Sequence, residues 1–224
     1  MPAERPARLK TARTIVKRLP KRARYERDVV DAVLDEAMIC HVGFVHDGHP
    51  YVIPTGFARD GDTLYVHGSN ASRMLRTLSA GVPVCVTVTL LDGLVVARSA
   101  FHSSMNYRSV VILGTATPVT DPDAKLLAMR ALVDHLIPER WPDLRPITSK
   151  ELAQTTVLAI PLQEASAKVR TGGPLDDEDD YALPMWAGVV PLALSPSRPE
   201  SDERLPAGIP TPSYVRRYRR PSGR

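Results

Sequence analysis

The sequence predicts a mainly β protein with a few helices, built as a small antiparallel barrel of about six strands. Three observations favour this fold class. The middle of the chain is made of short runs rich in β-forming residues, Asp-Gly pairs separate them at 47–48, 60–61 and 92–93, and helical periodicity is confined to a few stretches. An Asp-Gly pair between two strand-like runs is the strongest short-range hairpin signal, and strands joined by hairpins are antiparallel.

The first half of the chain begins with a basic stretch and then gives a helix from Tyr25 to Ala37, because Val29 and Val33 recur at helical spacing. The pattern then changes to short strands. A second, short helix is predicted from Ser72 to Ala80. The predicted strands before that helix are MICHVGFV, HPYVIPTGFA and DTLYVH.

The second half extends the sheet with VPVCVTVTLL, LVVARSAF and YRSVVILGTATPV. A helix is predicted from Asp121 to Leu136, with Pro122 in its first turn, where the missing N–H costs nothing. After a proline-rich link, TTVLAIPLQEASAKVR is predicted as one last long strand with a proline interruption. The prolines and arginines from Ser195 onward are typical of a disordered segment.

The predicted organisation is one domain between two basic tails. Residues 1–24 form a basic N-terminal extension, 25–192 the folded domain, and 193–224 a basic Pro/Arg-rich tail. The net charge of +4 hides this asymmetry, since the first 27 residues carry a charge of +8 and the central body is acidic. Because no aromatic residues alternate with these charges, we expect solvated tails, dispensable for cofactor binding, and no nucleic-acid partner.

Composition also narrows the location of the protein. No apolar run approaches the roughly 20 residues needed to span a bilayer, so no membrane partner is expected. The basic N-terminus lacks the apolar stretch of a secretory signal. Cys40 and Cys85 both lie in apolar strand-like runs and form no metal-ligand spacing. Two buried, reduced thiols are typical of a cytoplasmic protein, and no metal site is predicted.

The first candidate site is YVHGSNASRMLRTL, residues 65–78, where a strand runs into a helix. Unpaired N–H groups at a helix start favour an anion, and Ser69, Ser72, Arg73 and Arg76 add hydroxyl donors and positive charge. The stretch therefore allows a phosphate seat. It equally allows a plain helix cap, with arginines that face water.

The second and third candidates are SAFHSSMNYRS, residues 99–109, and Pro184-Met185-Trp186. The first mixes polar side chains with aromatic and sulfur-containing ones, a combination that suits a flat, polar-edged ligand. A histidine in such a run is also an ordinary structural hydrogen-bonding residue, and Trp186 equally suits a core anchor or a subunit contact.

Together, the HGSNASRMLRTL helix start, the ARSAFHSSMNYRSV segment and PMWAGVVPL resemble the pyridoxamine 5′-phosphate oxidase-like superfamily of flavin-binding split barrels. The similarity covers about residues 25–192. It points to the branch that contains nitroimidazole-resistance-type and flavin-nucleotide-binding proteins. The resemblance implies a six-stranded split barrel that pairs as a homodimer, with FMN at the interface and a small, flat substrate.

Carried over by position, the resemblance implies that Ser72 and Arg73 hold the FMN phosphate. Residues before them line its approach, a neighbouring strand lies along the flavin, and the polar segment edges its ring. Trp186 closes the pocket, from the same or the partner chain. The remaining implied cofactor contacts are Ile53, Pro54, Thr55, His67, Gly68, Ser69, Asn70, Ser99, Ala100, Phe101, His102, Asn106, Tyr107 and Arg108.

Two departures leave the activity open. Pyridoxamine phosphate oxidases place a lysine after the phosphate arginine, where this chain has Met74, and their substrate-phosphate pattern has no match here. No catalytic acid or base is predicted. The main hypothesis is an FMN-dependent oxidoreductase; the alternatives are a deazaflavin cofactor, a haem protein with His67 and His102 as iron ligands, or a non-enzymatic flavin-binding protein.

Overall fold

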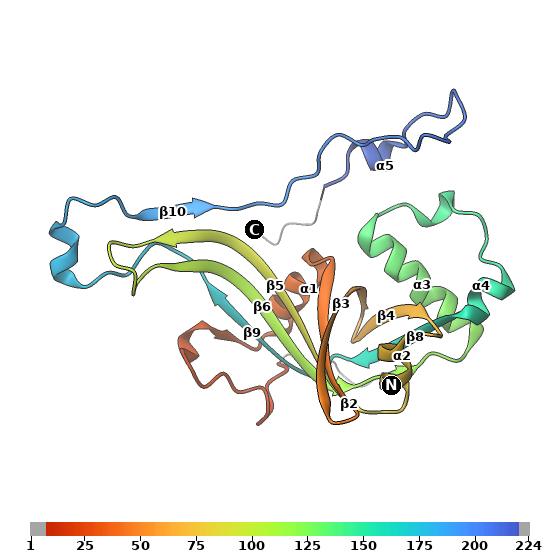
Figure 1. Cartoon of the computed structure of the whole chain (residues 1–224), viewed down its shortest axis with the longest axis horizontal. Coiled ribbons are helices and arrows are strands. Elements are labelled where there is room, and N and C mark those ends of the chain that lie inside the picture. Colours follow the sequence, from red (N-terminus) through yellow and green to blue (C-terminus); the bar gives the residue numbers. More distant parts are fainter. Residues whose placement is uncertain (1–7, 220–224) are drawn as a thin grey trace.

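The computed structural model describes residues 8–219, and within them one antiparallel sheet of ten strands forms the body of the protein (Figure 1). The strands are β1 (Ala23–Arg24), β2 (Ile39–His46), β3 (His49–Asp60), β4 (Thr63–Ser69), β5 (Pro83–Val96), β6 (Ser104–Thr115), β7 (Thr117–Pro118), β8 (Thr155–Pro161), β9 (Glu164–Arg170) and β10 (Gly188–Pro191). Their order is β1-β9-β6-β5-β2-β3-β4-β8-β7, and β10 pairs with β5 outside this path. The mainly β, antiparallel fold class is confirmed.

Five α-helices and three short 3₁₀ helices accompany the sheet in the described residues. The helices predicted from 25, 72 and 121 are confirmed with their ends shifted by one or two residues. The helices are η1 (Pro20–Arg22), α1 (Arg27–Glu36), α2 (Arg73–Ser79), α3 (Pro122–Leu136), η2 (Trp141–Asp143), α4 (Ser149–Gln154), η3 (Glu178–Ala182) and α5 (Ser213–Arg216). None of them has the length and apolar character needed to cross a membrane.

The first two predicted hairpins are present. Asp47 and Gly48 join β2 to β3 with φ angles of 50° and 75°, so the turn uses the left-handed conformation that an Asp-Gly pair tolerates best. β3 turns into β4 at Gly61, which also has a positive φ. The local chemistry of these pairs therefore determines two of the strand connections.

The third Asp-Gly pair, Asp92-Gly93, is not a hairpin turn. It forms a bulge inside β5, where the pairing with β6 shifts register between Leu91 and Gly93, and the strand continues to Val96. A Cβ atom on Gly93 would lie 3.0 Å from the carbonyl oxygen of Val190. The glycine is thus needed because β10 approaches the strand closely, rather than because the chain reverses there.

The prediction of one last long strand is also wrong, because the segment forms two strands. The segment divides at Pro161 and Leu162 into β8 and β9, which lie in different parts of the sheet. β8 pairs with β4 and β7, whereas β9 pairs with β6 and β1. Proline cannot donate a ladder hydrogen bond, so the break falls where the chain crosses between the two halves of the split barrel.

The core lies inside the curved sheet, and α1 closes one side of it. Val30, Val33 and Leu34 of α1 are fully buried in the same cluster as the sheet residues. Several ion pairs hold the helix in place, among them those between Arg59 and Asp35 and between Arg108 and Glu36. The other large buried side chains include Phe57, Leu64, Leu75, Leu78, Val86, Ile112, Leu158, Ile160 and Leu162.

The outer halves of β5 and β6 leave the body as a long arm, which the strand β10 accompanies (Figure 1). The 3₁₀ helix η3 lies near the end of this arm. A large share of the exposed apolar side chains of the chain belongs to it, including Phe101, Met105, Trp186 and Val190. An isolated chain exposes this apolar surface to water, so the arm lacks a partner within one chain.

The two segments predicted as tails contact the body. Leu9 is only 1% exposed, and its carbonyl oxygen accepts a hydrogen bond from the backbone N–H of Ala165. The C-terminal segment runs from the arm back to α3, where the hydroxyl of Tyr214 contacts Arg140 and Asp143. The prediction of disorder from residue 195 is therefore wrong for this docked end, although 192–212 contains no helix or strand.

Candidate functional site

The start of α2 combines a weak helix cap with two unpaired cations. The hydroxyl of Ser72 accepts a hydrogen bond from the N–H of Leu75 at 3.4 Å, the long end of the range. Arg73 and Arg76 are exposed, and no carboxylate of the described residues forms an ion pair with either of them. The guanidinium of Arg73 lies 4.3 Å from the centre of the Tyr51 ring, which holds the side chain over β3.

The strand end that leads into α2 is rigid. A Cβ atom on Gly68 would meet Leu75 at 3.1 Å, so the absence of a side chain lets β4 and α2 pack closely. Asn70 uses both ends of its amide, donating to the carbonyl of Ala153 and accepting from the hydroxyl of Thr156, each at 2.7 Å. Asn70 therefore fixes the turn to α4 and β8, and Ser69 accepts from the N–H of Ala71.

His67, on the same strand end, is exposed and forms no hydrogen bond or ion pair with the described residues. The pKa of His67 lies below its ordinary value, because surrounding atoms desolvate the charged form of the ring. The ring is therefore neutral at neutral pH. A neutral imidazole with a free nitrogen is the form that accepts a hydrogen bond or binds a metal.

The three predicted residues of β3 lie on opposite faces of the sheet. Pro54 is exposed and pairs with His41, so it belongs to the outer face. Ile53 and Thr55 alternate with it; Ile53 packs against the core and the hydroxyl of Thr55 bonds to the carbonyl of Gly56. This stretch is close to the Tyr51 ring that carries Arg73, so β3, β4 and α2 form one group of candidate residues.

The tip of the arm forms a second group, held together by the acidic loop that the sequence places after Gly173. Arg98 forms an ion pair with the fully buried carboxylate of Asp176 at 2.9 Å. His102 lies 3.3 Å from Asp177 and against the ring of Phe101. Ser99 accepts from the backbone N–H of His102, whereas Ala100 and Phe101 are exposed, Phe101 by 90%.

At the base of the arm, the predicted residues are mostly engaged in the protein. Arg108 lies between Glu36 at 2.5 Å and Asp92 at 2.8 Å, and these two carboxylates hold its pKa above the usual range. Asn106 is buried and donates to the carbonyl of Gly172. Tyr107 is half-buried and pairs with Arg170 of β9. Arg108 thus ties α1 to both strands of the arm.

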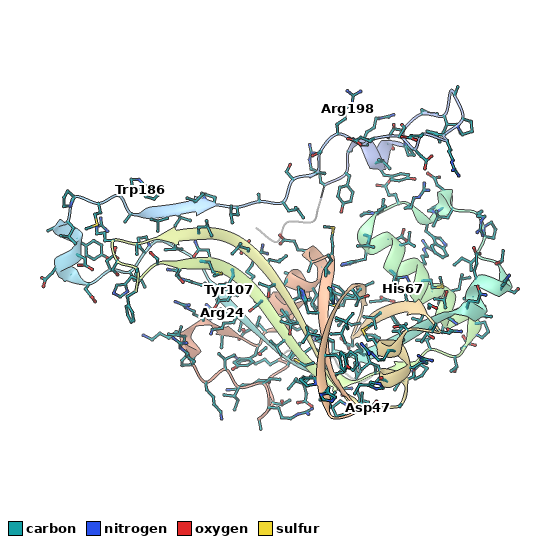
Figure 2. The ribbon with its side chains drawn as sticks, in the orientation of Figure 1. Arg24, Asp47, His67, Tyr107, Trp186 and Arg198 are labelled. Atoms are coloured by element: carbon teal, nitrogen blue, oxygen red, sulfur yellow. The ribbon has the colours of Figure 1, made fainter. Side chains whose placement is uncertain are left out.

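The structure does not bring the two groups together within one chain. Trp186 lies on the arm and His67 on the far side of the barrel (Figure 2). The Trp186 ring is 67% exposed and lies over Gly188, where a Cβ atom would be 2.9 Å from it. The phosphate-side residues and the ring-side residues of the predicted cofactor site are therefore separated by the length of the arm.

An apolar outer face, which the sequence analysis did not single out, joins β3, β2 and β5. Ile39, Val45 and Val52 are each more than half exposed there, and His41 stands among them without a partner in the described residues. A shallow groove of about 350 Å³ crosses this face and includes Cys85. The available signal in the sequence was that β2 and β3 carry apolar residues on both faces, where a strand with one solvated face would alternate apolar and polar residues.

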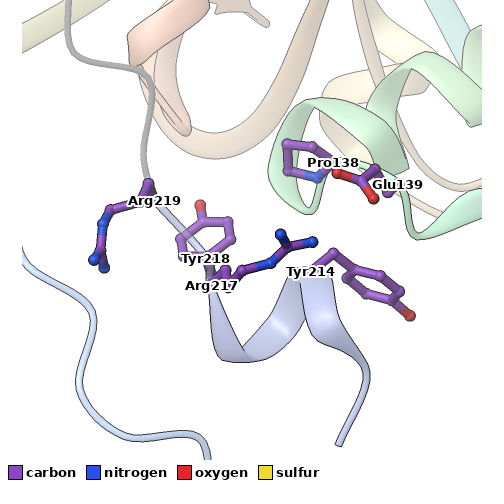
Figure 3. A pocket seen from close by; sticks show the side chains of 6 residues that line it. All are labelled: Pro138, Glu139, Tyr214, Arg217, Tyr218 and Arg219. Atoms are coloured by element: carbon purple, nitrogen blue, oxygen red, sulfur yellow. The ribbon is translucent and has the colours of Figure 1, made fainter.

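Another cavity, of about 300 Å³, lies where the C-terminal segment meets the end of α3 (Figure 3). Pro138 and Glu139 form one side, and Tyr214, Arg217 and Tyr218 the other. It contains none of the predicted cofactor residues. Within residues 8–219, no cluster of three or more His, Cys, Asp or Glu side chains is arranged to hold a metal ion.

Comparisons with known proteins agree with this arrangement. The model of the pyridoxamine 5′-phosphate oxidase family matches residues 26–169. The flavocytochrome Anf3 from Azotobacter vinelandii is 46% identical, with a TM-score of 0.87, covering 92% of this chain and 95% of that one. The FAD and haem binding protein from Mycobacterium smegmatis is 43% identical, with a TM-score of 0.84, covering 87% and 96%.

A more distant structure shares the fold alone. A protein from Bacteroides thetaiotaomicron, described as a 5-nitroimidazole antibiotic resistance protein, is 23% identical with a TM-score of 0.54, covering 66% of this chain and 86% of that one. No match was found among curated proteins. Both of the more similar structures cover more of this chain than the family match does.

Proposed function

Because the chain belongs to the pyridoxamine 5′-phosphate oxidase family, we propose that it is a homodimeric flavin-binding redox protein that also carries a haem. The observation that carries the proposal is the likeness, at more than 40% identity, to a flavocytochrome and to a protein that binds FAD and haem. Each likeness extends over most of both chains. The proposal combines the flavin hypothesis of the sequence with its haem alternative.

The residues at α2 fit a flavin phosphate. Arg73 and Arg76 are two exposed cations without carboxylate partners in the described chain, next to the Ser72 hydroxyl. The phosphate of FMN carries nearly two negative charges and the pyrophosphate of FAD carries two, one on each phosphate; a planar guanidinium binds either through paired hydrogen bonds. When bound, the flavin supplies electron and hydride transfer. The chain supplies the charge that anchors its phosphate and the Tyr51 ring that orients Arg73.

The family resemblance implies FMN, whereas the M. smegmatis protein binds FAD. We take FAD as the flavin of this protein, because that relative is 43% identical over most of its length. Acid extraction of the purified protein followed by mass spectrometry distinguishes the two nucleotides. Recovery of FMN alone would restore the original expectation, and recovery of deazaflavin would overturn both.

A second copy of the chain completes the flavin site in this proposal. The arm carries the ring-side residues, and these lie far from α2 of the same chain (Figure 2). The arm and the outer face both expose apolar side chains, which a symmetric partner would cover. Trp186 then contacts the flavin of the opposite protomer. The small, flat substrate and the cytoplasmic location expected from the free cysteines belong to the same proposal.

Of the two histidines expected to ligate haem iron, His67 fits better than His102. His67 is exposed and has no partner in the described residues, and desolvation lowers its pKa. The Nε2 atom of His102 is covered and faces the carboxylate of Asp177. Haem supplies one-electron chemistry when bound, and a neutral imidazole is its most common protein ligand.

The haem assignment is tested by absorption spectra of His67→Ala and His102→Ala, each purified and then supplied with haemin and FAD. The His67→Ala protein is expected to lose the Soret shift that marks iron ligation and to keep bound flavin. The His102→Ala protein is the matched control and is expected to keep both. A normal Soret band in His67→Ala would contradict the assignment, without affecting the flavin proposal.

A further inference from the structure

Arg170, the last residue of β9, is a buried cation without a carboxylate. It is 7% exposed, and its guanidinium donates to three neutral oxygens, the side chain of Asn106 and the carbonyls of Gly172 and Gly173. Buried charges in proteins are normally paired with an opposite charge. Neutral acceptors satisfy its hydrogen bonds, but they leave its positive charge uncompensated.

Other cations surround Arg170 on the same edge of the sheet. β1 pairs Ala23 with Lys168, and η1 places Arg22 directly before that pair. Burial and, next, the charge of Arg22 lower the pKa of Arg170, and a smaller opposing effect of Tyr107 raises it. Arg22 and Lys168 are both half-buried and form no ion pair with residues 8–219. Figure 2 shows Arg24 and Tyr107 on this side of the molecule, away from His67.

The acidic residues near this edge are already occupied. Glu164, on the same strand, is held by Arg13 and Thr11. Glu26, next to β1, is held by Arg8, and Asp92 by Arg108 on the neighbouring strand. The cations of β9 and η1 therefore lie on neighbouring segments, and none of the three forms an ion pair with an acid of residues 8–219. Such a grouping is unfavourable unless an anion from outside the chain compensates it.

We propose that Arg22, Lys168 and Arg170 form a binding site for a multiply charged oxyanion, at the seam between the N-terminal segment and β9. Tyr107 of β6 is the direct strand partner of Arg170, so the two side chains lie on the same face of the sheet. Phosphate groups of a nucleotide and the carboxylates of a porphyrin share the required chemistry; the second source rests on the haem proposed above. Arg22 and Arg170 both lie outside the family match of 26–169.

Titration calorimetry of the full chain with inorganic pyrophosphate tests the site directly. We expect binding that weakens with ionic strength and is reduced about tenfold by Arg22→Ala or Lys168→Ala, since a charge-assisted contact contributes on that order. Arg170→Lys is the third variant, because it keeps the buried positive charge and loses the planar guanidinium. Arg198→Ala removes one exposed cation of the C-terminal segment and is expected to change nothing.

Two further probes distinguish the sources. Displacement of pyrophosphate by ADP, with the same loss in the variants, assigns the site to a nucleotide. Binding of haemin that is weakened both by the variants and by esterifying its carboxylates assigns it to a porphyrin. Pyrophosphate affinities that are equal in the wild type and all three variants, or no binding of any probe, would overturn the proposal. Flavin binding through Arg73 is measured separately in the same proteins, so the oxyanion site and the flavin site can each fail without affecting the test of the other.

Discussion

The phosphate-seat hypothesis and the helix-cap hypothesis for the start of α2 predict opposite effects of Arg73→Ala on flavin binding. We expect Arg73→Ala to weaken flavin nucleotide binding about 30-fold or more if the pair is desolvated, and less at an exposed rim. The melting temperature without ligand should barely change, because Arg73 is exposed and contacts only Tyr51. Fluorescence titration with FAD, FMN and riboflavin provides the measurement.

Ser72→Ala separates the cap from the phosphate contact. Loss of a helix cap costs about 1 kcal/mol of stability without ligand, and the 3.4 Å cap bond predicts the lower end of the range. Riboflavin, which has no phosphate, should bind both variants as it binds the wild type. Equal FMN and FAD affinities of Arg73→Ala and wild type would contradict the phosphate seat.

His67 predicts a pH dependence of stability. Its pKa is lowered in the folded protein by desolvation, so the unfolded chain binds the proton first as the pH falls. The contribution is present above the ordinary histidine value of about 6.5 and is lost as pH falls through the lower, folded value. Urea unfolding without ligand should therefore show a steeper loss of stability below about pH 6.5 in the wild type than in His67→Gln. Identical slopes would show that His67 is solvated.

Several residue roles could not be read from the chain alone. Asn70 and Arg108 were expected near the cofactor, but partners far away in sequence occupy their polar groups. The register of β5 on β6 brings Asp92 to Arg108, and the packing of α1 brings Glu36. By contrast, Ser72 and Arg73 follow from local sequence, since a helix start determines which side chains lie beside its free N–H groups.

At the scale of elements, most of the fold follows from local patterns. The two Asp-Gly pairs at 47–48 and 60–61 mark hairpins, and three helices begin within a residue or two of their predicted starts. The same pair at 92–93 is a bulge, because β10 packs against it from a distant part of the chain. Tertiary pairing thus overrides the turn signal where a third strand is present.

The N-terminal segment packs on the body, so we expect it to contribute to stability, whereas its dispensability for cofactor binding stays a prediction. Leu9 is buried in the main core, so Leu9→Ala should cost roughly 2–4 kcal/mol. Deletion of residues 1–24 removes Leu9 together with the β1 pairing to β9 and should lower stability further. Chemical denaturation measures both changes, with Ile15→Ala, at a side chain that is 47% exposed, as the control. An unchanged midpoint for Leu9→Ala would contradict this packing.

At the scale of the whole molecule, the proposed dimer covers the outer face and should therefore change how fast the cysteines are alkylated. Cys40 is buried, and burial raises the pKa of its thiol to about 12, so it should resist alkylation in the native state. Cys85 is half-buried in the groove of the outer face. It should be protected where light scattering gives a dimer and be labelled on dilution. A monomer mass at micromolar concentration, or Cys85 labelling that does not depend on concentration, would contradict the dimer.

The assembly of the site was beyond local patterns for a physical reason. The helix start at 72 and the polar segment at 99–109 are separate features of the sequence, and the arm holds them apart within one chain (Figure 2). In the proposed dimer a second copy brings them together, which sequence periodicity does not encode. The dimer is proposed from the family resemblance, and the haem from the likeness to a flavocytochrome and to an FAD and haem binding protein.

The absorption spectrum of the protein as purified tests the central claim most directly. A flavin gives paired bands in the blue and near ultraviolet, and a haem adds an intense Soret band. We predict both signatures in one gel-filtration peak, with the flavin bands bleached and the haem bands shifted on addition of dithionite. A spectrum with flavin bands alone would remove the haem from the proposal, and a colourless protein that takes up neither haemin nor FAD would contradict the account.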